Sequence, residues 1–112
     1  MKLSSLTQQD KIKLAAELDG YSNVRPLIVR NVTERGDDRF CGMTSDSGWC
    51  PHYSTSYDAI IPLIQKLRHG NESLHAEVLD ALGELGHKGY YTEATPSQLL
   101  DALLVATGKA TL

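Results

Sequence analysis

Apolar residues recur at helical spacing in four segments of the chain, and one run between them has a β-type composition. The helical segments are residues 7–19, 54–69, 71–85 and 95–108. Residues 25–43 instead hold a Leu-Ile-Val run and a second apolar stretch, as in a β-hairpin. This pattern predicts an α+β fold, in which about four helices pack with a small antiparallel sheet of two to three strands in a layered sandwich. The expected order is α-β-β-α-α-(β)-α.

Capping signals locate the ends of the first and last helices. Thr7 and Asp10 resemble a capping box with aspartate in place of glutamate. The last helix has the clearest signal, because Thr95, Pro96 and Gln98 supply an N-cap, a proline at the first helical position and a capping-box glutamine. A glycine follows each of the four predicted helices, as is common at helix C-termini: Gly20, Gly70, Gly86 and Gly108.

The two middle helices have less regular starts. The hydroxyls of Ser54, Thr55 and Ser56 predict the cap of one helix, and Asn71 predicts the cap of the next. Pro62 lies inside the first of these helices, where it removes a backbone hydrogen bond at a cost of about 3 kcal/mol. Either the helix kinks at Pro62 or it begins later than its caps suggest, and the position of Pro62 on the polar face makes a kink tolerable.

Three connections follow from the same pattern. The sequence ERGDD, residues 34–38, predicts the turn of the hairpin, and SDSG, residues 45–48, predicts a loop that leads to Trp49. Tyr90 and Tyr91 suit an added edge strand in the link of residues 88–94, which is the bracketed strand of the predicted order.

Length and charge narrow the classes of function. At 112 residues, the chain is expected to form a single domain over residues 1–112. The net charge of −3 makes nucleic acid a poor candidate partner. No apolar run approaches the roughly 20 residues that span a bilayer, and the N-terminus lacks the apolar stretch of a signal peptide. We therefore expect a cytoplasmic protein without membrane contact, with both cysteines reduced.

Two segments of the chain have a characteristic order of residues. One is WCPHYSTSYDAIIPLIQKL, residues 49–67, and the other is the closing ATPSQLLDALLVATG, residues 94–108. Both resemble segments of the phage ABA sandwich domain family, and the opening LTQQDKIKLAAELDGY, residues 6–21, fits that family loosely. The resemblance implies a small protein encoded by a phage or prophage, and no catalytic residues are carried over from it. The chain departs from the family at residues 71–85, where an acidic helix replaces an expected strand and leaves the number of strands open.

Cys41, Cys50 and His52 carry donor atoms that zinc prefers. Their spacing, C-x8-C-x-H, lacks the C-x2-C or H-x3-H pairs of structural zinc sites, and the glycines do not have P-loop or Rossmann spacing. We therefore expect no metal and no cofactor, with the thiols buried as small apolar groups. A metal site would need a fourth ligand from elsewhere in the chain: His69, His75, His87 or Asp46.

The same cysteine raises a catalytic alternative. Cys50 could act as a nucleophile with His52 as its base and Asp58 as the acid that orients the imidazole, in a small hydrolase or transferase. That chemistry needs the imidazole within hydrogen-bond reach of the sulfur and a lowered thiol pKa. Residues two apart around a proline guarantee neither, so we do not expect an enzyme.

Aromatic residues gather in the segment before the second helix. Trp49, His52, Tyr53 and Tyr57 could form a platform for a small ligand such as a nucleotide-like molecule. In a small domain with few aromatic residues, such side chains more often cover one end of the core, with their polar tips in water. We favour this structural interpretation and keep ligand sequestration as an alternative.

One face of the third predicted helix is acidic. Glu77, Asp80 and Glu84 lie opposite its leucines, and Ser73 completes the stripe. The stripe is either a solvated face or a docking surface for a partner with a basic surface, where complementary charge would speed association.

These observations favour a non-enzymatic binding protein. The preferred hypothesis is a phage accessory factor that acts on a host protein in the bacterial cytoplasm, such as an inhibitor of a host defence system. The acidic stripe is its candidate surface, and a homodimer is compatible with the sequence. Binding of a small molecule or metal is the second hypothesis, and the Cys50 and His52 enzyme is the third.

Overall fold

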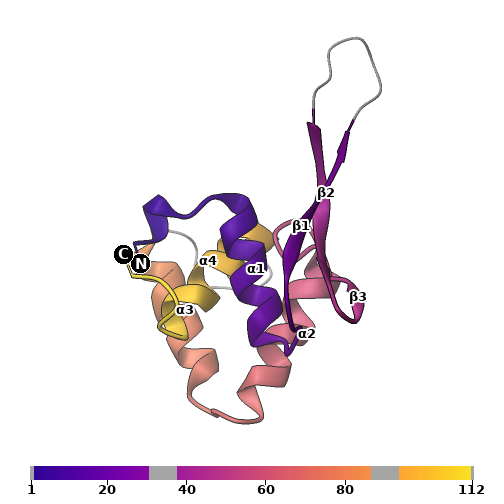
Figure 1. Ribbon diagram of the computed structural model, residues 1–112. Helices are drawn as coiled ribbons and strands as arrows, with labels where there is room; N and C mark the ends of the chain where they lie inside the picture. Colours follow the sequence, from indigo (N-terminus) through magenta and orange to yellow (C-terminus); the bar gives the residue numbers. More distant parts are fainter. Residues whose placement is uncertain (1, 31–37, 87–93, 112) are drawn as a thin grey trace.

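The α+β fold predicted from the sequence is confirmed by the computed structural model, which describes residues 2–30, 38–86 and 94–111. Four helices form the body of the molecule, and a β-hairpin extends away from it (Figure 1). The elements in chain order are the 3-10 helix η1 (Leu3–Ser5), α1 (Gln8–Leu18), β1 (Arg25–Arg30), β2 (Asp38–Ser45), β3 (Gly48–Trp49), α2 (Tyr57–Arg68), α3 (Leu74–Glu84) and α4 (Pro96–Ala106).

Two helices begin at the predicted capping boxes. At α1, the Thr7 hydroxyl accepts a hydrogen bond from the Asp10 backbone N–H at 3.1 Å, and the Asp10 carboxylate accepts one from the Thr7 N–H at 3.0 Å. At α4, Thr95 and Gln98 make the same reciprocal pair at 3.2 and 3.0 Å, with Pro96 in the first helical position. Both boxes satisfy backbone N–H groups that a helix start leaves unpaired.

The starts of α2 and α3 differ from the predicted caps. Ser56 precedes α2, but its side chain makes no capping hydrogen bond. The prediction that Asn71 caps the third helix is wrong, because α3 begins at Leu74 after Ser73. Asn71 instead accepts the Leu74 N–H through its backbone carbonyl at 3.1 Å, and its side-chain oxygen accepts the Ser73 hydroxyl at 2.8 Å. A turn at residues 71–73 thus takes the place of a side-chain cap.

Pro62 lies inside α2, as expected, and is exposed on the outer side of the helix. The opposite side carries Ile60 and Ile64, which are buried in the core. The missing backbone donor therefore lies on the solvent side, where water can bind the freed carbonyl.

The sheet is antiparallel, in the order β1-β2-β3. The register passes from Leu27 opposite Gly42 to Ile28 opposite Phe40, so Cys41 is the extra residue of a β-bulge. The third strand is the short β3, which pairs with the end of β2, whereas the link of residues 88–94 predicted to supply an extra strand lies mainly outside the described residues. The predicted turn at residues 34–38 also falls outside them, except for its last residue.

The segment SDSG, expected from the sequence to form a loop leading to Trp49, is a tight turn. Ser45 pairs with Gly48 across the turn, and the Ser45 hydroxyl accepts the Ser47 N–H at 3.2 Å and donates to the Gly48 carbonyl at 3.0 Å. This turn reverses the chain at the base of the hairpin and places Trp49 on its short third strand.

The core lies between the helices, with α4 at its centre. This helix contacts α1, α2 and α3, and it buries side chains on most of its circumference. The core is built mainly from aliphatic residues. Its largest fully buried side chains are Tyr53, Ile60, Leu63, Ile64, Val78, Leu82, Leu99, Leu100, Leu103 and Leu104.

Candidate functional site

Trp49 and His52 meet over the backbone of Gly42. The Trp49 side chain is 57% exposed, the largest exposed fraction among the big apolar residues described. A Cβ atom at Gly42 would lie 3.3 Å from His52 Cε1 and 3.4 Å from Trp49 Cζ3. Both rings therefore lie close over the bulge because residue 42 has no side chain, and Gly42 also has a φ of +142° that L side chains rarely adopt. The result is an exposed aromatic surface at the base of the hairpin.

Tyr53 is committed to the fold. Its side chain is fully buried, and its hydroxyl donates to the Asp19 carboxylate at 2.6 Å. Burial, followed by the hydrogen bond to Asp19 and the negative charge of that residue, raises the pKa of the Tyr53 hydroxyl above its ordinary value of 10.0. Tyr53 thus ties the segment before α2 to the C-terminal end of α1.

Tyr57 is also tied to a distant segment. It is 45% exposed, and its hydroxyl donates to the Ala94 carbonyl at 2.6 Å, which joins the start of α2 to the residue before the α4 cap. Of the four predicted ligand residues, Trp49 and His52 come together, whereas the hydroxyls of Tyr53 and Tyr57 are used in separate structural contacts.

Cys50 has the environment of a structural thiol. The residue is 4% exposed, and burial raises the pKa of the thiol above 9.0, with the charge of Asp19 adding to the rise and a hydrogen bond with Ser45 opposing it. A nucleophilic cysteine needs accessibility and a lowered pKa, and the buried Cys50 thiol with its raised pKa has neither. His52 is exposed on the surface over Gly42, and Asp58 is exposed on the first turn of α2.

The structure brings no metal-ligand set together among the residues it describes. No group of three or more His, Cys, Asp or Glu side chains there could hold an ion. Of the weak candidates, Cys50 is buried and His52 is exposed, and Cys41 is described only as the backbone of the β-bulge.

The acidic stripe of α3 is exposed along its whole length. Ser73, Glu77, Asp80 and Glu84 all lie on the surface, and the buried residues of the helix lie on another side. The Ser73 hydroxyl donates to Glu77 at a long 3.4 Å. No cation within the described ranges pairs with these three carboxylates. Three carboxylates elsewhere do form ion pairs: Asp101 with Lys11, Asp46 with Arg25 and Asp19 with Lys66.

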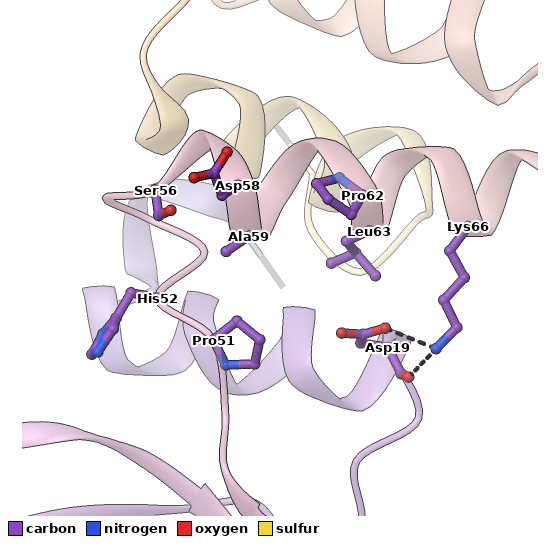
Figure 2. A pocket seen from close by; sticks show the side chains of 9 residues that line it. All are labelled: Asp19, Pro51, His52, Ser56, Asp58, Ala59, Pro62, Leu63 and Lys66. Atoms are coloured by element: carbon purple, nitrogen blue, oxygen red, sulfur yellow. Dashed lines mark hydrogen bonds and ion pairs between the residues drawn. The ribbon is translucent and has the colours of Figure 1, made fainter.

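A groove lies between the start of α2, the segment before it and the end of α1 (Figure 2). At its right end in Figure 2, Lys66 Nζ donates to the Asp19 carboxylate at 2.8 Å and to the Asp19 backbone carbonyl at 2.6 Å. The groove has a volume of about 360 Å³ and is lined by Asp19, Pro51, His52, Ser56, Asp58, Ala59, Pro62, Leu63 and Lys66.

Sequence reasoning missed this groove. The sequence pattern relates His52 to the cysteines and aromatic residues, and Asp58 to a catalytic set, and gives no sign that both line one groove. The groove depends on contact between residues 19 and 66, which lie 47 positions apart, and no local pattern reports that contact. A larger hollow of about 620 Å³ near the turn between α2 and α3 is lined by exposed polar side chains alone: Gln65, Arg68, His69 and Glu72.

Comparisons with protein families, with curated proteins and with solved structures give no match to this chain. Within the described ranges, no helix combines the length and the apolar character needed to cross a membrane.

Proposed function

We propose that the chain is a phage- or prophage-encoded accessory protein that binds a host protein in the bacterial cytoplasm and catalyses no reaction. Inhibition of a host defence system is the role that we propose for such binding. The resemblance to the phage ABA sandwich domain family supports the origin. The observation that carries the binding role is the exposed stripe of Glu77, Asp80 and Glu84 on α3.

This stripe supplies negative charge that the described part of the fold leaves uncompensated. Asp19, Asp46 and Asp101 each pair with a cation, and Asp10 caps a helix. The α3 carboxylates form no ion pair with the described residues, and only Glu77 accepts a hydrogen bond, a long one from Ser73. A partner with a basic surface would therefore be attracted over several ångströms in solution, and complementary charge raises the association rate more than it raises affinity.

The test is capture of a partner from bacterial lysate by the tagged protein, with mass spectrometry of the retained proteins. The variant E77Q/D80N/E84Q removes three charges and keeps the shape of the side chains. We expect it to lose the host protein that the wild type retains, and we expect wild-type binding to weaken as salt is raised.

A matched control changes net charge by the same amount away from α3. Ser4, Gln8 and Ser47 are exposed, so S4K/Q8K/S47K adds three positive charges and keeps the stripe. This control should still bind, and both variants should keep the wild-type circular dichroism spectrum. Equal retention of the partner by the wild type and by E77Q/D80N/E84Q would exclude the stripe as the contact.

A further inference from the structure

The groove beside α2 has apolar walls and two different ends. Pro51 on one side and Ala59, Leu63 and Pro62 on the other form its middle, and Figure 2 shows Ala59 and Leu63 pointing from α2 toward the segment that carries Pro51. A concave surface with apolar walls and polar groups at its ends is typical of a binding site.

The charges at the two ends are not equivalent. Lys66 closes one end, but its charge is compensated by Asp19 at 2.8 Å. Asp58 stands at the rim of the other end, beside Ser56 on the first turn of α2. Its exposed carboxylate has no partner among the residues that the structure describes. In the described part of the chain, the groove therefore has a negative charge without a partner at one end, on Asp58, and none at the end with Lys66 and Asp19.

We propose that this groove binds a segment of a partner protein in which an aliphatic side chain stands next to an arginine or lysine. The aliphatic side chain fills the space between Pro51 and α2, and the basic side chain pairs with Asp58. This inference rests on the proposed function and deepens it, because it gives the basic partner a second contact away from α3 and states what that contact must contain.

The size of the groove supports an occupant of this kind. Pockets for drug-sized ligands run from about 300 to 1,000 Å³. At about 360 Å³, this groove is near the lower limit, which suits one or two side chains better than a nucleotide-like molecule. An ion pair at an exposed rim adds little affinity, but it fixes the orientation of the bound segment. Burial of the aliphatic side chain therefore supplies most of the binding free energy.

The experiment is a titration of 15N-labelled protein with short peptides, followed by 1H–15N NMR. The probe is acetyl-Gly-Leu-Arg-Gly-amide at millimolar concentration. We expect saturable shifts confined to the backbone amides of residues 19, 52, 56–61 and 63–66, since Pro51 and Pro62 carry no N–H. Replacing the leucine of the peptide by glycine should weaken binding at least about ten-fold, because the buried aliphatic surface is lost. Replacing its arginine by glutamate should weaken binding about two- to five-fold or more.

Matched variants locate the binding site. Ala59→Met places a longer side chain in the groove and should weaken peptide binding at least about ten-fold, whereas Ala76→Met on the exposed side of α3 should not. Asp58→Asn should reduce the preference for arginine over glutamate, whereas Asp80→Asn should keep it. If Ala59→Met does not fold, as judged by its NMR dispersion, Asp58→Asn with the two charged peptides carries the test.

Several results would overturn the proposal. They are an absence of shifts in the groove at millimolar peptide, equal binding of all three peptides, and shifts outside the groove. Concentration-dependent shifts of the same residues without peptide would indicate a second copy of the chain as the occupant. Failure of the α3 variant to affect host-protein capture, with peptide binding intact, would instead remove the stripe and leave the groove in place.

Discussion

At the scale of single residues, two side chains hold protons more tightly in the folded protein than in the unfolded chain. Burial raises the pKa of Tyr53, and the bonded carboxylate of Asp19 raises it further; burial also raises the pKa of Cys50. In both cases, the neutral form is favoured by folding. The resulting stability is present below the unfolded pKa values, about 9 for the thiol and about 10 for the phenol, and is lost as pH rises further.

We predict that the free energy of unfolding falls between pH 9 and pH 11 and that Tyr53→Phe reduces this fall. At pH 7, the variant should be less stable by about 1.5–3 kcal/mol, because the lost hydrogen bond joins a hydroxyl to a charged group. Tyr57→Phe is the control: its bond to the Ala94 carbonyl is neutral and half-exposed, so about 0.5–1.5 kcal/mol is expected. Urea unfolding at several pH values measures both. Equal pH dependence in the wild type and Tyr53→Phe would contradict the attribution of this fall to the Tyr53 hydroxyl.

Gly42 gives a second prediction at this scale. Gly42→Ala should lower the free energy of unfolding by about 1–3 kcal/mol, since φ is +142° and the new methyl group would press on His52 and Trp49. Gly83→Ala is the matched control: it lies in α3 with open space around it and should stabilise the protein by about 0.5–1 kcal/mol. Thermal unfolding and the fluorescence of Trp49 check the pair. A neutral Gly42→Ala with unchanged fluorescence would count against the close packing described.

At the scale of helices and strands, the sequence predicts the start of an element well when all the residues that form its cap lie within a few positions of one another. The two capping boxes appear as expected because threonine and its partner three residues later satisfy each other whatever the surroundings. Asn71 failed as a predictor because a backbone carbonyl took the role expected of its side chain. The short strand β3 was not predicted either, because it depends on the hydrogen bonds of the SDSG turn, which reverse the chain tightly.

The two kinds of helix start should respond differently to mutation. Thr95→Ala removes a side chain that accepts the Gln98 N–H and should cost about 0.5–2 kcal/mol. Asn71→Ala leaves its backbone bond to Leu74 intact and should cost less than half as much. Chemical unfolding of both variants provides the comparison. A larger loss from Asn71→Ala would show that its side chain supports α3 more than a cap would.

At the scale of the whole molecule, prediction from sequence reached the fold class but not the groove. Apolar periodicity is a local property, so it identifies the helices and the hairpin. The groove exists because the C-terminal end of α1 receives Tyr53 from one segment and Lys66 from another, at sequence separations of 34 and 47 residues. In the sequence, Tyr53 looks like an ordinary core tyrosine and Lys66 like an ordinary surface lysine, so neither indicates a groove.

The Asp19–Lys66 contact tests this long-range arrangement. A double-mutant cycle of Asp19→Asn and Lys66→Met should give a coupling of about 0.2–1 kcal/mol, because the lysine is more than half exposed and water screens the pair. The cycle Asp10→Asn with Lys66→Met is the control, since these side chains share no contact in the structure. Urea unfolding of each variant gives the energies. A coupling no larger than that of the control would remove the ion pair from the account of the groove.

The start and the end of the described chain lie side by side (Figure 1), where the Leu3 N–H donates to the Thr111 carbonyl at 2.7 Å and Lys2 and Thr111 form a parallel bridge. In topological terms, the backbone is nearly a closed ring. A short linker across this bridge, with new ends at the exposed turn between α2 and α3, should therefore give a circular permutant with the same fold. The order in which the helices are synthesised would then change, while their neighbours in space would not.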